Sequence, residues 1–490
     1  MLDYDQTRAG FGKSYTQLKR LAQSKRQTIH LVPSIDLAKE QQRLLQLLNP
    51  HLSVKVIHGD SVNGSTTHAF CNEIMQSSAS VIISTHATFK LALFRGLSMF
   101  NEYDLSIDES MSFHKAHALS IYKSSFDLIT SYLNFVSADE GRYSVTVKDG
   151  KRSQVEALLA GSEHDDLFEA SNIKDFFTFV LSASHTTYIP KFRLENFISI
   201  DEALEKRTTL LTAGSIINTS LLEQFNSVKI LSADFTLSES YYVMRNAGFA
   251  FNDVSMGPVV NERENVFIHY YIDENWTATK RDNSDPNKNW FNNRGHGIQH
   301  YVIQDAMSKI GNARAIANCN SKYEYLFSIP VVNTPHGLND YDTVANAICV
   351  SSANADSNEI HALNDVFGVT RAEIDFERNV MSCNQFCNRT IIRNRDMSDI
   401  RVDLFVVDKR RADYLKAKFP NATVVREAVQ QIESIVERNR LTVIPRAVVK
   451  TRSYKESQLK SGIRLKPRSY SQYVDIMNTY YSQETIIANN

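Results

Sequence analysis

Glycines, a lysine and a serine lie together near the start of the chain, in the stretch TRAGFGKSYT. A glycine-rich turn that leads into a helix aims backbone N–H groups at a phosphate, and a neighbouring lysine adds positive charge. The looser form of such a loop is matched by Gly10, Gly12, Lys13 and Ser14. Thr7 stands where the strict pattern has glycine. The stretch predicts a phosphate-binding loop, with an ordinary glycine turn as the alternative.

Two adjacent carboxylates close an apolar run farther along the chain, in YDLSIDES. Asp108 and Glu109 would lie at the carboxyl end of a strand, which is where open α/β sheets bind ligands. One carboxylate can hold Mg²⁺, and the other can take a proton from a water that attacks a phosphate. Together with the lysine loop, the pair predicts a site for a nucleoside triphosphate.

A parallel sheet would bring these residues together. Short apolar runs alternate with helical patterns; the predicted strands are MLDYD, QTIHLVPS (27–34), VKVIHGD (54–60), SVIISTH (80–86), YDLSIDES (103–110) and NSVKILSADF (226–235). Predicted helices cover 35–48 and 67–76, and a further helix follows the lysine loop. Strands separated by helices indicate parallel pairing with right-handed crossovers, and hence a doubly wound sheet.

A second series of strands and helices begins near residue 264. Its predicted strands are ENVFIHYYIDE, RAIANCNS, VANAICVSS and VDLFVVD. The interval of roughly 115–205 is helical in pattern and rich in Phe and Tyr, which predicts a helical insertion whose aromatic residues form a core. We therefore expect an α/β fold with two doubly wound parallel-sheet domains, residues 1–240 and 263–445, and a basic, Tyr-rich C-terminal tail, residues 446–490.

The composition is that of an ordinary globular protein. The 490 residues are 42% hydrophobic and 22% charged, and the formal net charge is −1. A net charge this small gives no general attraction to nucleic acid, so any such binding needs a local channel. The basic tail would suit phosphate neutralisation and base stacking, or would be a solvated segment.

Cysteine usage and hydropathy bear on the location of the protein. Five cysteines without a dense framework indicate reduced thiols, and Cys383 with Cys387 lacks the second ligand pair that a zinc site needs. The sequence shows no signal peptide and no apolar run long enough to cross a bilayer. We expect a soluble cytoplasmic protein, in the host cytoplasm if a phage encodes it.

In their order along the chain, these motifs resemble the superfamily-two helicases, two-domain RecA-like translocases that are common among phage and plasmid replication proteins. In the first domain, motifs I, Ia, Ib, II and III are resembled by AGFGKS, LVPS (31–34), STHATF (84–89), IDES and ILSAD (230–234). In the second, motifs IV, V and VI are resembled by ANCNSK (317–322), HGLNDYD (336–342) and NQFCNRTIIRN (384–394). The departures are Thr7, Asp234 for the usual Thr, Asn388 for Gly, and a second motif VI arginine one place late.

The resemblance implies that both domains have a RecA-like fold, and it implies roles for individual residues. ATP would lie between the domains, with Gly10, Gly12, Lys13 and Ser14 on its phosphates, and Ser14 and Asp108 on Mg²⁺. Catalysis would involve Glu109, Gln385, Arg389 and Arg393, and coupling to movement would involve Ser232 and Asp234. Single-stranded DNA would contact Thr85, His86, Thr88, Gly337 and Asn339.

Several alternatives stay open at this point. Arg389 and Arg393 could be a pair on a solvated helix face, and His86 could be a structural histidine. The chain could be a packaging ATPase joined to a nuclease, with Asp375 and Asp408 as strand-end metal ligands, or a degenerate RecA-like scaffold of a replication complex. DNA versus RNA, other replication proteins as partners, and the oligomeric state are not decided by the sequence.

Overall fold

The computed structural model describes residues 1–7, 12–97, 100–162, 168, 170–199, 208–256, 262–277, 280–281, 297–333, 341–394 and 397–441. The chain divides into one unit of residues 1–283 and 302–427, and another of 284–301 and 428–490. Every described strand belongs to the first unit. In the second unit the structure describes 297–301, where α12 (Ile298–Ile310) begins, and 428–441, which contains α17 (Gln430–Leu441).

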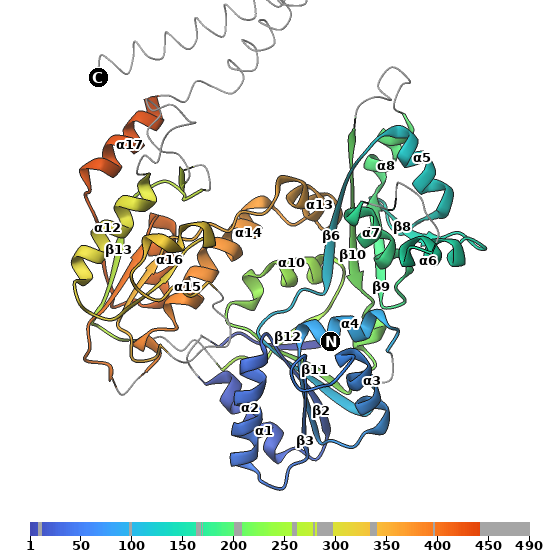
Figure 1. The fold of residues 1–490 in the computed structure, drawn as a ribbon, viewed down its shortest axis with the longest axis horizontal. Helices are drawn as coiled ribbons and strands as arrows, with labels where there is room; N and C mark the ends of the chain where they lie inside the picture. The colour runs from blue at the N-terminus through green and yellow to red at the C-terminus, as the bar shows by residue number, and fades with distance from the viewer. Residues whose placement is uncertain are drawn as a thin grey trace, which may run out of the picture. The chain divides into compact units, whose positions relative to one another are not determined.

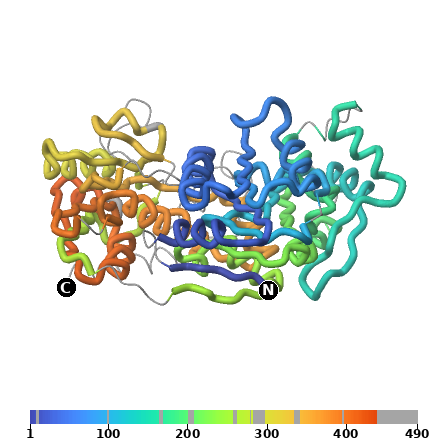
Figure 2. Tube along the Cα trace, turned by 90° about the horizontal axis from the view of Figure 1, so that it is seen from below, coloured from blue at the N-terminus to red at the C-terminus, as the bar shows by residue number. Residues whose placement is uncertain are grey.

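Sheet A carries the lysine loop and consists of seven parallel strands. In spatial order they are β12 (Phe251–Asp253), β1 (Leu2–Asp5), β11 (Ser227–Leu231), β5 (Tyr103–Asp108), β2 (Gln27–Val32), β4 (Val81–Thr85) and β3 (Val54–Ile57). The short run MLDYD does form a strand, which Figure 2 shows in dark blue beside the green β12. All six strands predicted in this part of the sequence are present.

Helices cover both faces of sheet A, as a doubly wound fold requires. On one face, α1 (Lys13–Gln23) and α2 (Ile35–Leu48) lie side by side (Figure 1). They bury Leu18, Leu21 and Leu45 against strand residues Val32 and Ile83. The other face packs against α3 (Thr66–Gln76), α4 (His86–Phe94) and α10 (Glu239–Asn246). The short elements α9 (Thr219–Leu222) and η3 (Phe235–Leu237) flank β11.

Sheet C forms the second domain and is also wholly parallel. Its order is β14 (Ala315–Asn318), β15 (Asn346–Cys349), β16 (Val402–Val406), β13 (Val266–Tyr270) and β17 (Thr423–Arg426). Its helical elements include η4 (Ser321–Leu326), α13 (Ser357–Phe367), α14 (Arg371–Asp375), the π-helical η5 (Phe376–Met381), α15 (Ser382–Cys387), η6 (Ile391–Arg393) and α16 (Lys409–Lys418). The predicted fold class, α/β with two RecA-like parallel-sheet domains, is confirmed.

The insertion in the first domain differs from the expected helical subdomain because it also contains an antiparallel sheet. The described part of the insertion contains the helices α5 (Lys123–Tyr132), α6 (Arg152–Ala160), α7 (Ser171–Leu181) and α8 (Lys191–Ile198). They cover sheet B, whose order is β6 (His114–Ile121), β10 (Thr209–Ile217), β9 (His185–Pro190), β8 (Arg142–Val147) and β7 (Leu133–Ser137). Phe126, Phe176, Phe177 and Phe197 are buried between helices and sheet, so the prediction of an aromatic core is confirmed. These strands carry polar residues at buried positions, such as His117, Thr187 and Thr212, and this weakens the alternation of polar and apolar residues that identifies a strand.

Helix α13 of the second domain packs against sheet B. Gly214 on β10 makes this possible, because a Cβ there would lie 2.5 Å from Cε2 of Phe367 and 2.9 Å from Cγ1 of Val366. Asp365 on the same helix accepts hydrogen bonds from Arg193 at 2.9 Å and Thr212 at 3.0 Å. A close apolar contact and a charged contact thus fix α13 on the insertion.

Gly214→Ala tests this contact. Because the added methyl group would overlap the Phe367 ring, we expect the free energy of unfolding to fall by about 1–3 kcal/mol. Gly141→Ala is the matched control, since the nearest atom to its Cβ would be 3.8 Å away. The measurement is the urea midpoint of the two variants and the wild type. Equal midpoints for both variants would contradict the tight packing of α13.

Candidate nucleotide site

The lysine loop and the carboxylate pair meet at the carboxyl end of sheet A. Strand β5 ends at Asp108, and α1 begins at Lys13 after Gly12, whose φ of 74° is in the left-handed region that favours glycine. The hydroxyl of Ser14 donates a hydrogen bond of 3.0 Å to Oδ1 of Asp108. Two residues that are 94 positions apart therefore form one polar site, as the sequence predicted.

Lys13 is held at the base of its own loop. Its Nζ donates a hydrogen bond to the carbonyl oxygen of Thr7. Burial lowers the pKa of Lys13, and the nearby carboxylates, of which Glu109 contributes most, oppose that change. Gly10 lies outside the described residues, so its predicted role in the loop stays a prediction.

Asp108 is almost completely buried, and Glu109 has a strained backbone. Burial, together with the nearby charge of Glu109, raises the pKa of Asp108 to about 6. Glu109 has a φ of 67°, an uncommon value for a residue with a side chain, and its N–H donates to the carbonyl of Leu231 at 2.9 Å. Such backbone conformations concentrate at functional sites.

A cavity of about 260 Å³ joins this site to residues of the second domain. On the side of sheet A it is lined by Gly12, Lys13, Ser14, Asp108 and Glu109, among others. From the second domain it is lined by Gln385, Asn388, Arg389 and Arg393. The structure thus brings the predicted phosphate loop, carboxylates and arginines around one cavity.

The two arginines do not lie on a solvated helix face, so that alternative is wrong. Helix α15 ends at Cys387, before Arg389, and Arg393 belongs to the separate element η6. Burial lowers the pKa of both guanidinium groups. The change is opposed mainly by Glu109 at Arg389 and by Asp342 at Arg393, and Glu40 opposes it at both. The arginines therefore face acidic groups across the cavity.

Three residues that the sequence did not predict line or support the cavity: Glu40 and Gln41 on α2, and His30 on β2. Gln41 donates from Nε2 to Oδ2 of Asp108 at 2.7 Å, and its Oε1 lies 2.6 Å from Nε2 of His30. Burial lowers the pKa of His30 to about 4. The available signal was three polar residues at otherwise apolar positions of an expected strand and helix.

The predicted coupling residues lie just after β11. The N–H of Ser232 donates to the carbonyl of Asp5 at 3.1 Å, which holds the segment against β1. Asp234 has a φ of 58° and forms an ion pair with Lys418 at the end of α16. Asp234 therefore connects the first domain directly to a helix of the second.

The residues predicted to contact DNA are described in part. Thr85 ends β4 and caps α4, where its Oγ1 accepts from the N–H of Thr88 at 3.3 Å; the two hydroxyl oxygens are 3.0 Å apart. Nε2 of His86 lies 3.1 Å from the carbonyl oxygen of Asp108, beside the nucleotide site. Gly337 and Asn339 lie outside the described residues, as does the tail from 446. DNA contact by these residues stays a prediction.

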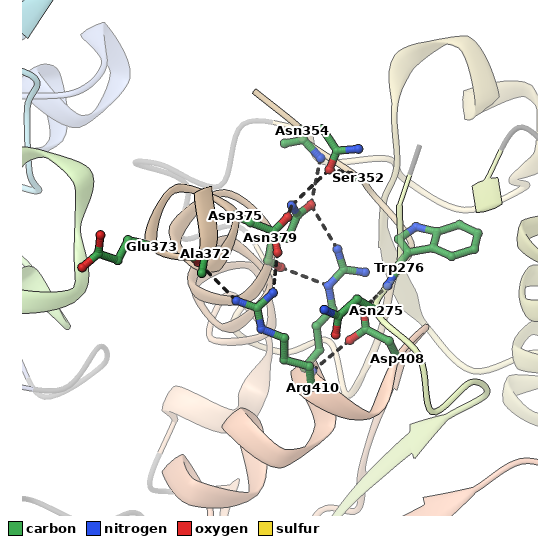
Figure 3. A network of polar contacts seen from close by, with 12 residues as sticks. Asn275, Trp276, Ser352, Asn354, Ala372, Glu373, Asp375, Asn379, Asp408 and Arg410 are labelled. Carbon is green, nitrogen blue, oxygen red and sulfur yellow. Dashed lines mark hydrogen bonds and ion pairs between the residues drawn. The ribbon is translucent and has the colours of Figure 1, made fainter. Parts of the chain in front are cut away.

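A separate polar network lies at the carboxyl end of sheet C (Figure 3). Asp375 pairs with Arg410 and accepts from Asn379 at 2.8 Å, and it ends helix α14 instead of a strand. Asp408 caps α16 and accepts from the N–H of Trp276 at 2.8 Å. Both carboxylates that the nuclease alternative would use as metal ligands thus hold neighbouring elements together.

The described residues include no group of three or more His, Cys, Asp or Glu side chains arranged to hold a metal ion. The five cysteines are free thiols, and four of them are buried. No helix in the described ranges is both long and apolar enough for a membrane span.

Comparison with solved structures finds proteins of similar fold at low identity. The chain is similar to S. tokodaii Xpd4, with 11% identity over 86% of this chain and 96% of that one, and a TM-score of 0.42. It is also similar to S. cerevisiae Dbp5 bound to RNA and ADP BeF3, with 12% identity over 89% and 88% of the two chains and a TM-score of 0.34. A third similar structure is a DEAD box protein from Methanococcus jannaschii, with 10% identity over 87% of this chain and 88% of that one, and a TM-score of 0.31. No family model and no curated protein matches the chain.

The buried His30 predicts a loss of stability in acid. Its pKa is about 4 in the folded protein and about 6.5 when unfolded, so its stabilising contribution is present above pH 6.5 and is lost as pH falls towards 4. Between about pH 7.5 and pH 5, this group alone should lower the free energy of unfolding by about 2 kcal/mol.

Urea unfolding of His30→Gln at the two pH values checks this expectation. The difference in unfolding free energy between the two pH values should be smaller than in the wild type by about the same 2 kcal/mol. His51→Gln serves as the control, because it changes an exposed histidine in the turn between α2 and β3. A His30→Gln protein with the wild-type pH dependence would show that His30 is not held neutral.

Proposed function

We propose that this chain is an ATP-driven helicase or translocase that acts on single-stranded DNA. The observation that carries the proposal is the single cavity in which Lys13, Ser14 and Asp108 of the first domain face Arg389 and Arg393 of the second. A cleft between two RecA-like domains that has basic groups on both sides suits a triphosphate whose binding and hydrolysis change the domain contact.

The loop and the strand end would hold the nucleotide. Lys13 would pair with the β- and γ-phosphates, and the backbone N–H groups at the start of α1 would add further donors. Ser14 and Asp108 fit Mg²⁺, because a hydroxyl and a carboxylate 3.0 Å apart are the hard oxygen donors that this ion prefers. When bound, Mg²⁺ supplies neutralisation of phosphate charge. Glu109 would take the proton of the attacking water.

The second domain would complete the site. Gln385, Arg389 and Arg393 line the same cavity, and guanidinium groups can stabilise charge that develops on a transferring phosphoryl group. Both arginines interact electrostatically with Glu40 and Glu109. A bound triphosphate would take over part of this pairing and draw the two domains together.

Two further contacts would connect hydrolysis to movement along a strand. Asp234 of the first domain pairs with Lys418 of the second, so opening or closing of the cleft would alter this ion pair. Ser232 precedes it on the same segment. Thr85, His86 and Thr88, with Gly337 and Asn339 of the second domain, would lie along the backbone of the strand without reading bases. Phage or plasmid replication, and a cytoplasmic location, remain predictions from the family resemblance.

The first test is ATP hydrolysis by the purified chain with and without single-stranded DNA, beside Lys13→Ala and Glu109→Gln. We expect DNA to stimulate hydrolysis, and both substitutions to abolish it because they remove phosphate binding and proton abstraction. Single-stranded RNA in place of DNA tests the choice of nucleic acid. Nucleotide binding without any hydrolysis would contradict the motor and support the scaffold alternative.

Arg389→Ala tests the contribution of the second domain. If Arg389 acts on the transferring phosphoryl group, kcat should fall by about 10³ to 10⁵ with a much smaller change in nucleotide affinity. Arg371→Ala, at an exposed arginine on α14, is the matched control and should leave kcat unchanged. The measurement is kcat and KM for ATP under saturating DNA. A fall in kcat of less than tenfold would remove Arg389 from the reacting centre.

A further inference from the structure

We infer that Gln41, held in place by His30, is a positioning residue that aims the Asp108 carboxylate at the Mg²⁺ site. The inference rests on the proposed function, and it concerns residues that none of the helicase-like motifs includes. Gln41 lies on α2, which follows the LVPS segment, and His30 lies on β2. Neither is within the lysine loop or the Asp-Glu pair.

The hydrogen bonds of Asp108 divide its two oxygens between two supports. Oδ1 accepts from the hydroxyl of Ser14 at 3.0 Å, and Oδ2 accepts from the amide of Gln41 at 2.7 Å. An ionised carboxylate can only accept hydrogen bonds, so the amide nitrogen of Gln41 must face it. The amide oxygen of Gln41 then faces His30.

His30 fixes the orientation of that amide. Its Nε2 lies 2.6 Å from Oε1 of Gln41, so Nε2 must carry the proton; Nδ1 then accepts from the hydroxyl of Ser106 at 3.0 Å. Ser106 is two residues before Asp108 on β5, and it is the register partner of His30 in the parallel pairing of β2 with β5. The hydrogen bonds therefore run from Asp108 through Gln41 and His30 to Ser106. Because Asp108 and Ser106 are both on β5, the backbone of that strand closes the ring.

Burial makes this ring rigid. Exposed fractions are 0% for His30, 2% for Gln41, 2% for Ser106 and 4% for Asp108. Where water cannot supply alternative partners, rotating the Asp108 carboxylate would leave a buried amide N–H without an acceptor. Hydrogen bonds of this kind around a metal-binding carboxylate orient it, and their loss weakens metal binding by about 10–100-fold.

The variant Gln41→Leu keeps the approximate size of the side chain and removes the donor. Gln46→Leu makes the same change at an exposed position of the same helix and is the control. The primary measurement is the affinity for ADP by calorimetry, with excess Mg²⁺ and again with EDTA. The ratio of the two affinities reports how strongly Mg²⁺ supports nucleotide binding, independently of hydrolysis.

We expect Gln41→Leu to reduce this ratio by about tenfold or more, with the affinity in EDTA within about twofold of the wild type. The Mg²⁺ concentration that gives half-maximal hydrolysis should rise by a similar factor. Gln46→Leu should match the wild type in both. If Gln41→Leu does not fold, Ser106→Ala removes only the hydroxyl that holds His30, and a reduction in the same ratio is expected.

Two results would overturn the inference while leaving the proposed function intact. One is a Gln41→Leu protein whose Mg²⁺ dependence equals that of Gln46→Leu. The other is an equal loss of ADP affinity with Mg²⁺ and with EDTA, which would indicate general damage to the nucleotide site. A wild-type chain that binds no ADP under either condition would instead overturn the proposed function, and this inference with it.

Discussion

The structure of the first domain depends on a buried carboxylate. Asp108 ends the central strand β5, and burial there costs free energy unless each oxygen has a partner. Those partners come from helix α1 through Ser14 and from helix α2 through Gln41. Satisfying one charge therefore fixes both helices on the same face of sheet A. Because the lysine loop leads directly into α1, the position of α1 also fixes the loop at the end of β5.

The second domain is held to the first by further charged contacts. Glu239, at the start of α10, accepts from His114 at 2.9 Å and from Arg378 at 3.1 Å, and Arg378 also pairs with Glu359. Glu377 accepts from the N–H of Glu239 at 2.5 Å, and burial raises the pKa of that carboxyl to about 7. Glu377 and Arg378 lie in the π-helical segment η5, and such irregular turns often occur at functional sites. Because η5 runs directly into α15, these contacts also set where Arg389 lies.

The sequence predicted what depends on local pattern. Apolar runs predicted the strands of sheets A and C except the two short edge strands β12 and β17, and the positions of Lys13, Ser14 and Asp108 after or between them predicted that the three would meet. What depends on packing was missed. The strands of sheet B alternate too weakly to be found, and the docking of α13 follows from one glycine, Gly214, that looks ordinary in sequence. Gln41 was missed because an amide on an amphipathic helix is usually a solvated residue, and only the fold turns it towards Asp108.

The near-neutral charge of the whole chain is consistent with a strongly charged site. The cavity contains three cationic side chains, those of Lys13, Arg389 and Arg393, together with the carboxylates of Glu40, Asp108 and Glu109. These three positive and three negative charges balance one another, so they add nothing to the net charge of −1. On the proposed function, a triphosphate would bring the excess negative charge that the arginines can pair with, and its hydrolysis would return them to Glu40 and Glu109. On this proposal, the contact between the domains would depend on the nucleotide through the balance of charge inside the cavity. The total charge of the chain would have little effect on it.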